Sequence, residues 1–214
     1  MSDVVFSVSG GLYAILDDSI VPGGDWSGAA RDLLVGGARV IQIRAKSMEA
    51  GDMLRATRAV AAQCRDFGAT FIVNDRADVA LISGAMGVHV GQEDLPVHAC
   101  RKVLGDRAII GVSTHSMEEA GAAINDGADY IGYGAIYPTD TKGKGVAARG
   151  VESLAAIVKT APIPVVAIGG IGPENVAAVK AAGASAAAVI SSLAANGDLK
   201  EGAESMIRAW ENAK

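Results

Sequence analysis

Residues 73–94 read VNDRADVALISGAMGVHVGQED and contain two strand-like runs with a short helical segment between them. An apolar run over residues 70–73 stops at Asn74-Asp75-Arg76, and a second run over residues 86–90 stops at Gly91-Gln92-Glu93-Asp94. Neighbouring strands of a parallel sheet lie about 4.8 Å apart. If these two strands are neighbours, Asp75 and Asp94 share one rim of the sheet.

Alternating strand and helix patterns continue along the whole chain. The sequence predicts strands over residues 11–16, 39–44, 70–73, 86–90, 108–112, 129–132, 164–168 and 186–190. It predicts further helices over residues 27–36, 49–67, 96–104, 116–125, 151–159, 173–182 and 199–210. The strands are continuous apolar runs, which is typical of sheets with both faces buried. Roughly eight strand–helix units fit a (β/α)8 TIM barrel, a single catalytic domain over residues 1–214.

An open doubly wound sheet is the main alternative to the barrel. The barrel is favoured because polar residues follow nearly every predicted strand, whereas an open sheet would gather them at one crevice. No linker, charge run or low-complexity segment indicates a domain boundary.

The composition excludes several classes of partner. The formal net charge of -5 argues against nonspecific binding to nucleic acid. No apolar run approaches the ~20 residues of a membrane span, and the N-terminus lacks a signal-peptide pattern. Cys64 and Cys100 have no metal-ligand spacing, so we expect reduced, structural cysteines in a cytoplasmic protein. The expected partners are small molecules, and homo-oligomerisation stays open.

Candidate site residues follow the predicted strands, where the active site of a TIM barrel lies. Gln42, Arg44 and Lys46 alternate and should point to one side, and an amide with two cations suits a phosphate or pyrophosphate. An ordinary solvated strand end is an equal alternative for them. Asp75 and Asp94 could bind Mg²⁺, which takes one or two carboxylates together with substrate phosphate.

Each of these aspartates, taken alone, is better explained as a helix N-cap. Two of them on adjacent strand ends, beside the cations, reverse that preference. His89 lies inside an apolar strand, so a core or supporting histidine is favoured over a ligand. Ser113 could hydrogen-bond a ligand or start a turn. His115 is an acid–base candidate with an equally good capping or surface role.

Two further segments suggest phosphate binding. The long irregular piece over residues 134–150 contains Tyr137-Pro138-Thr139-Asp140-Thr141-Lys142, which predicts an anion-binding lid, the alternative being an ordinary polar loop. Gly169-Gly170 and Ser191 follow the last two strands, where barrels commonly hold a phosphate against a short helix. Two anion sites on one rim suggest a condensation with pyrophosphate as the leaving group.

Six motifs occur in order over nearly the whole chain. They are Gln42-Ile43-Arg44-Ala45-Lys46, Val73-Asn74-Asp75-Arg76, Gly87-Val88-His89-Val90-Gly91-Gln92-Glu93-Asp94-Leu95, Gly111-Val112-Ser113, Pro138-Thr139-Asp140-Thr141-Lys142 and Ile168-Gly169-Gly170-Ile171. Together they resemble the thiamine-phosphate synthase (thiamine phosphate pyrophosphorylase) family. The resemblance implies a TIM-barrel transferase that joins hydroxymethylpyrimidine pyrophosphate to a thiazole phosphate, with Mg²⁺, and releases pyrophosphate.

The resemblance also implies roles for individual residues. The Mg²⁺ ligands would be Asp75 and Asp94. The pyrophosphate contacts would be Arg44, Lys46, Asn74 and Lys142. Gln42 and Ser113 would touch the pyrimidine. The thiazole phosphate would be held by Thr139, Thr141, Gly170, Ile190 and Ser191. The implied catalytic residues are Arg44, Lys46, Ser113 and Lys142, which would act electrostatically in a dissociative reaction that needs no protein nucleophile.

The chain departs from the family pattern at Tyr133, at Ala135 and over residues 143–149. The closest rival function is that of the related thiazole tautomerase, which shares the barrel, the glycine loop and a histidine matching His115 but lacks the paired Asn-Asp-Arg and Gln-Glu-Asp motifs. A non-catalytic ligand-binding barrel would require a broken metal site. Another phosphosugar-type isomerase is disfavoured by the Thr-x-Thr-Lys lid.

Overall fold

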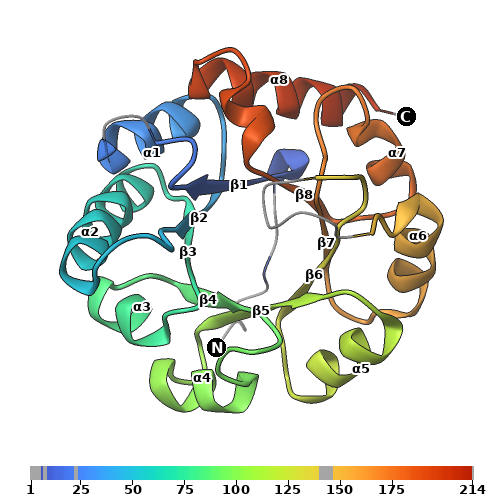
Figure 1. Cartoon of the computed structure of the whole chain (residues 1–214), viewed down its shortest axis with the longest axis horizontal. Coiled ribbons are helices and arrows are strands. Elements are labelled where there is room, and N and C mark those ends of the chain that lie inside the picture. The colour runs from blue at the N-terminus through green and yellow to red at the C-terminus, as the bar shows by residue number, and fades with distance from the viewer. Residues whose placement is uncertain (1–5, 7–8, 22–23, 140–146, 214) are drawn as a thin grey trace.

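Eight parallel strands close into a barrel in the computed structural model, which describes residues 6, 9–21, 24–139 and 147–213 (Figure 1). The strands are β1 (Leu12–Asp17), β2 (Val40–Arg44), β3 (Thr70–Asn74), β4 (Gly87–Val90), β5 (Ile109–Thr114), β6 (Tyr130–Gly134), β7 (Val165–Ile168) and β8 (Ala186–Val189). They pair in sequence order, and β1 pairs with β8. This closure confirms the predicted TIM barrel and excludes the open sheet.

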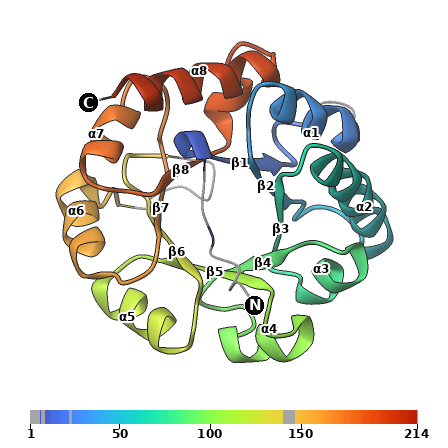
Figure 2. The same cartoon turned by 180° about the vertical axis from the view of Figure 1, so that it is seen from behind.

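An outer ring of helices surrounds the strands, as both views of the molecule show (Figures 1 and 2). The helices are α1 (Trp26–Val35), α2 (Ala50–Asp66), α3 (Ala77–Ser83), α4 (Val97–Leu104), α5 (Met117–Asn125), α6 (Gly150–Thr160), α7 (Val176–Ala181) and α8 (Leu199–Asn212). Within the described residues the structure also has the short 3₁₀ helices η1 (Ser9–Gly11) and η3 (Ser191–Ala194). A short helix of the kind that commonly holds a phosphate after the last strands is therefore present, and it begins at Ser191.

Local sequence accounts for several helix starts. The Ser116 hydroxyl accepts a hydrogen bond from the Glu119 amide at 3.1 Å, which is the N-terminal bond of a Ser-x-x-Glu capping box at the start of α5. Asp25 caps α1 and Asp198 caps α8 in the same way. The helix predicted over residues 173–182, before β8, is longer than the helix in the structure. Residues 173–175 form a turn, because the Gly172 amide bonds the Asn175 side chain, and α7 begins at Val176.

The core lies inside the barrel and between the strands and the helices. All residues of β1, β4, β6 and β8 are buried, in agreement with their continuous apolar runs. Cys64 and Cys100 are both buried and free, as expected. Within the described ranges, no helix combines the length and apolar character needed to cross a bilayer.

Candidate active site

A cavity of about 270 Å³ opens at the C-terminal ends of the strands. Its wall is formed by residues at or just after the ends of β2 to β8, which is where TIM barrels carry their active sites. The predicted site residues that line it are Arg44, Lys46, Asn74, Asp75, Asp94, Ser113, Thr139, Gly170, Ile190 and Ser191. The structure therefore brings residues from six strand ends and the predicted lid to one space.

One described site residue, Gln42, is not in this wall, and two predicted ones cannot be placed. Thr141 and Lys142 lie outside the described residues. Gln42 is described, but it is 2% exposed and lies below the cavity, where its amide Nε2 donates to the Tyr13 hydroxyl at 2.8 Å. The alternation of Gln42, Arg44 and Lys46 thus places two cations in the cavity wall and the amide inside the barrel.

The two cations are each paired with a carboxylate. Arg44 donates to Asp17 across the β1–β2 pairing, where these residues stand in register. Burial favours the neutral form of Asp17, but hydrogen bonds from Ser19 and Arg44 outweigh it and hold the pKa of Asp17 below its usual value. Lys46 lies 3.4 Å from an Asp75 oxygen and is more than half exposed. Arg44 is therefore fixed in place, whereas Lys46 keeps solvent contact.

The Asp75 and Asp94 carboxyl groups lie within hydrogen-bonding reach of each other at the cavity wall. Burial raises the pKa of Asp75, and the Asp94 carboxyl raises it further, while the Lys46 ammonium lowers it. Asp75 also has a left-handed backbone, with φ of 63°, which costs a non-glycine residue about 1–3 kcal/mol. Its amide donates to the His89 carbonyl at 2.8 Å, which holds this conformation.

Neither aspartate caps the helix that follows it, so the alternative of two N-caps is wrong. The N-cap position of α3 is Arg76 and that of α4 is Pro96, and neither helix has a side-chain capping bond. The Asp94 carboxylate instead accepts from the Gly91 amide at 2.7 Å and closes its own turn. A close pair of carboxylates without a capping role requires another explanation.

The donor set at this point fits Mg²⁺. Mg²⁺ keeps several waters and is usually bound by one or two carboxylates plus substrate phosphates. In the part of the chain that the structure describes, no three His, Cys, Asp or Glu side chains are grouped to hold a metal ion. Asp75 and Asp94 alone would leave the remaining positions of a cation to water and phosphate oxygens. Metal binding by this pair stays a prediction.

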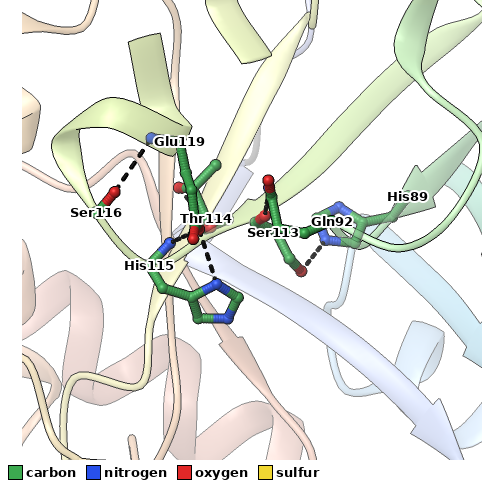
Figure 3. Close-up of polar contacts among 8 residues, drawn as sticks. His89, Gln92, Ser113, Thr114, His115, Ser116 and Glu119 are labelled. Atoms are coloured by element: carbon green, nitrogen blue, oxygen red, sulfur yellow. Dashed lines mark hydrogen bonds and ion pairs between the residues drawn. The ribbon is translucent and has the colours of Figure 1, made fainter. Parts of the chain in front are cut away.

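Ser113 is held from two sides at the end of β5 (Figure 3). Its hydroxyl lies 2.8 Å from the Nε2 atom of His89, and its carbonyl accepts from the Gln92 side chain at 2.7 Å. The next residue, Thr114, is bonded to the Gly132 carbonyl at 3.1 Å. His89 is buried and supports Ser113 and the strand, as we expected, although its edge also reaches the cavity wall.

His115 lies in the cavity wall on the other side of Ser113 (Figure 3). Its Nδ1 atom is 2.9 Å from a Glu119 carboxylate oxygen, and its amide donates to the same oxygen at 2.7 Å. The imidazole side chain is 43% exposed. The predicted capping role belongs to Ser116, so His115 is a partly exposed imidazole oriented by a carboxylate.

The glycine loop after β7 forms the opposite wall. Gly169 and Gly170 have φ of 99° and 63°, and a Cβ on Gly170 would stand 2.6 Å from the Pro138 carbonyl oxygen. Only glycine fits there, because both the backbone conformation and the space exclude a side chain. The Asn175 side chain donates to the Gly170 carbonyl at 2.9 Å and accepts from the Gly172 amide at 3.0 Å. The Asn175 side chain thus fixes the backbone of the loop at the cavity wall.

Backbone bonds hold the base of the predicted lid on both sides. The Ile136 amide donates to the Ile168 carbonyl, and the Tyr137 amide to the Gly169 carbonyl, at 2.9 and 3.0 Å. On its other end, the Arg149 amide donates to the Ala135 carbonyl at 2.7 Å. Ala135, one of the departures from the family pattern, lies in the cavity wall. Tyr133, a second departure from the family pattern, points away from the cavity wall. Its hydroxyl forms a hydrogen bond with the Ser153 side chain in α6.

The sequence reasoning missed four supporting residues. Asp17 ends a predicted strand next to the one that ends at Arg44, and this shared position was an available signal. Asn175 follows the glycine loop closely, but nothing in its neighbours indicates the loop as its partner. Tyr13 and Tyr130 lie within apolar runs, where a tyrosine is indistinguishable from an ordinary packing residue.

Comparisons with known proteins agree with this geometry. The family model described as thiamine monophosphate synthase matches residues 12–193. The thiamine-phosphate synthase of Anaeromyxobacter dehalogenans is 46% identical over 202 residues, covering 94% of this chain and 88% of the relative. That of Moorella thermoacetica is 45% identical over 188 residues, covering 88% and 90%. The solved thiamine phosphate pyrophosphorylase of Pyrococcus furiosus superposes with a TM-score of 0.86 at 37% identity, covering 94% of this chain and 96% of that one. The chain belongs to the thiamine monophosphate synthase family.

Proposed function

We propose that this protein is a thiamine-phosphate synthase, a transferase that joins hydroxymethylpyrimidine pyrophosphate to a thiazole phosphate and releases pyrophosphate. One observation carries the proposal together with the family membership. A single cavity has a wall of cations and paired carboxylates on β2 to β4 and a glycine phosphate loop on β7 facing it. Two phosphorylated ligands can therefore meet in one space.

The chemistry asked of the chain is electrostatic. Breaking the bond between the pyrimidine methylene and the pyrophosphate oxygen leaves negative charge on the pyrophosphate. Arg44, fixed by Asp17, and Lys46 lie where they would stabilise that charge. When bound by Asp75 and Asp94, Mg²⁺ would neutralise further charge on the leaving oxygens. Asn74 and Lys142 complete the proposed pyrophosphate contacts.

The second substrate is positioned by the opposite wall. Backbone amides of the Gly169-Gly170 loop, with Thr139, Thr141, Ile190 and Ser191, would hold the thiazole phosphate. Holding its ring nitrogen beside the pyrimidine methylene converts an encounter of two molecules into a step within one complex. The proposed reaction needs no protein nucleophile, because the thiazole nitrogen itself attacks the pyrimidine methylene.

A second candidate activity is supported by a specific observation. His115 is partly exposed in the cavity wall, and Glu119 orients its Nδ1 atom. A carboxylate-oriented imidazole can transfer a proton near neutral pH, so tautomerisation of a thiazole is the alternative. The carboxylate pair at Asp75 and Asp94 has no part in such a reaction, and its presence favours the synthase.

One assay separates the two activities. The protein is given both phosphorylated substrates with Mg²⁺, and the products are identified by mass and chromatography. We expect thiamine phosphate and pyrophosphate in equal amounts. Formation of a tautomerised thiazole without thiamine phosphate would refute the synthase and support the alternative. The cytoplasmic location and the homo-oligomer remain predictions from the sequence.

A further inference from the structure

Four hydrogen bonds cross the barrel interior from Gln42 to Ser113. The Gln42 amide nitrogen lies 2.8 Å from the Tyr13 hydroxyl, which lies 2.7 Å from the Tyr130 hydroxyl. The Tyr130 hydroxyl is 3.0 Å from the Nδ1 atom of His89, and His89 Nε2 is 2.8 Å from the Ser113 hydroxyl. We call these five residues the polar chain. Its last link, between His89 and Ser113, is visible in Figure 3.

The middle of the polar chain is fully buried and packed against an aromatic ring. Tyr13 and Tyr130 are 1% and 0% exposed, and burial raises the pKa of both phenols, so both keep their protons. The Phe6 ring stacks on the Tyr130 ring with centroids 4.1 Å apart. Gly111 provides the space, because a Cβ there would stand 2.1 Å from the Tyr130 ring. The sequence thus places two tyrosine hydroxyl groups in the core, and Gly111 leaves the space that the Tyr130 ring occupies.

The number of protons in the polar chain fixes its direction. The Gln42 amide nitrogen can only donate, so the Tyr13 hydroxyl accepts from it, and the Tyr13 proton then satisfies its hydrogen bond on the Tyr130 hydroxyl, the other group bonded to Tyr13. The Tyr130 hydroxyl then gives its proton to Nδ1 of His89, which must be unprotonated there. The other nitrogen, Nε2, therefore carries the imidazole proton and donates it to Ser113.

Ser113 is the end of this sequence of donors. Its oxygen accepts from His89, and its single proton is left for a ligand in the cavity that it lines. A hydroxyl without such a neighbour would rotate and act as donor or acceptor. Ser113 therefore has its proton available to donate, and a ligand acceptor atom facing it would satisfy that proton.

We propose that Tyr13, Tyr130 and His89 are positioning residues that set the direction of the polar chain, so that Ser113 presents a hydrogen-bond donor to an acceptor nitrogen of the pyrimidine substrate. The identity of that substrate rests on the proposed function; the direction of the polar chain does not. None of the three residues has to touch the substrate, because each acts through the next one.

The direction is measurable without any substrate. The two nitrogens of a neutral histidine have different ¹⁵N chemical shifts according to which one carries the proton. The protein has only three histidines to assign. We expect His89 in the substrate-free protein to be a single neutral tautomer with its proton on Nε2. A proton on Nδ1, or a mixture of both forms, would overturn the proposal.

Tyr13→Phe tests whether the direction is transmitted. It removes the link between Gln42 and Tyr130 while leaving the Tyr130–His89–Ser113 part in place, so the Tyr130 hydroxyl becomes free to accept from Nδ1. We expect the single His89 signal set to become a mixture of the two tautomers. The KM for the pyrimidine pyrophosphate should rise up to about tenfold, which is the worth of one neutral hydrogen bond. The KM for the thiazole phosphate should change by less than about twofold. A twofold change corresponds to less free energy than one hydrogen bond contributes.

Tyr133→Phe is the matched control. It removes a buried tyrosine hydroxyl from the same strand as Tyr130, but that hydroxyl bonds Ser153 outside the barrel interior. The His89 signals and the pyrimidine KM should match those of the unmodified protein. If Tyr13→Phe leaves the His89 tautomer pure, or if Tyr133→Phe changes it equally, the proposal fails. An inactive protein with the expected tautomer would refute the proposed function and leave the direction intact.

Discussion

Asp75→Asn should make the metal-free protein more stable and the enzyme inactive. Asp75 combines a left-handed backbone, partial burial and a carboxylate neighbour at Asp94. Asparagine has the same shape and tolerates the left-handed region, so the backbone strain is unchanged by the substitution. What the substitution removes is the negative charge beside Asp94, together with the ion pair to Lys46.

The size of the effect follows from these two opposed changes. Two like charges about 4 Å apart at a protein surface repel by about 4 kcal/mol before solvent and counter-charges weaken the repulsion. The Lys46 pair is more than half exposed on the lysine side and is worth at most about 1 kcal/mol. We expect a net gain of about 1 kcal/mol in the free energy of unfolding, or roughly 2–4 °C for a chain of this length.

Adding Mg²⁺ and pyrophosphate should make the unmodified protein more stable than Asp75→Asn. A ligand at 100 times its Kd stabilises the folded state by about 2.7 kcal/mol, and only the unmodified protein should gain this. Thermal unfolding is therefore measured for both proteins in EDTA and again with Mg²⁺ and pyrophosphate. Asp78→Asn is the control, since Asp78 is an exposed residue of α3 that pairs with Arg76 at 2.6 Å.

Asp78→Asn should lower stability slightly and keep the full response to Mg²⁺. The reasoning is refuted if Asp75→Asn is clearly less stable than the unmodified protein in EDTA, because the carboxylate would then be structural. It is equally refuted if Asp75→Asn keeps the Mg²⁺ response or near-normal condensation. Either result would mean that this carboxylate is not a metal ligand.

Three further predictions concern other parts of the molecule. Asn175→Ala should raise the KM for the thiazole phosphate about tenfold in steady-state kinetics and leave the pyrimidine KM unchanged, because it frees the glycine loop. Asp17→Asn should lower the free energy of unfolding at pH 7. Burial opposes the charge of Asp17, but bonds from Ser19 and Arg44 hold its pKa low, so its stabilisation is present above about pH 4 and is lost as the pH falls through the lower folded value. Denaturant titrations of the unmodified protein and of Asp17→Asn should therefore show that the difference between their free energies of unfolding becomes smaller in acid. A difference that does not change with pH would contradict this. Burial raises the pKa of Cys64 to about 12, so its thiol should not react with a disulfide reagent at pH 8 until the protein unfolds.

The barrel and most of its rim could be predicted from sequence because both depend on local patterns. Each strand is a continuous apolar run that ends abruptly in polar residues, and in a closed parallel barrel all such ends meet on one rim. Asp75 and Asp94 are therefore brought together by topology alone. Their distinction from helix caps was not available locally, because an aspartate before a helix has the same sequence pattern whether or not it caps.

The polar chain could not have been predicted, since its bonds depend on the strand register and on side-chain direction. Tyr13 and Tyr130 are 117 residues apart, and nothing in either run marks its hydroxyl as paired. Gln42 alternates correctly with Arg44 and Lys46, yet it sits one step deeper in the barrel, where its partner is a tyrosine. A period-two pattern gives the side to which a residue points but not the depth at which it ends.

The charges of the described rim explain why a divalent cation belongs in the proposed reaction. Arg44 and Lys46 each already face a carboxylate, Asp17 and Asp75, and Asp94 adds a further negative charge. The described part of the wall proposed for pyrophosphate thus carries more negative than positive charges before any ligand arrives, which weakens its attraction for an anion. A divalent cation held by Asp75 and Asp94 would add positive charge there and make this part of the wall net positive. We therefore expect anion binding to depend on a divalent cation, with Asp75 and Asp94 as the residues that cause this dependence.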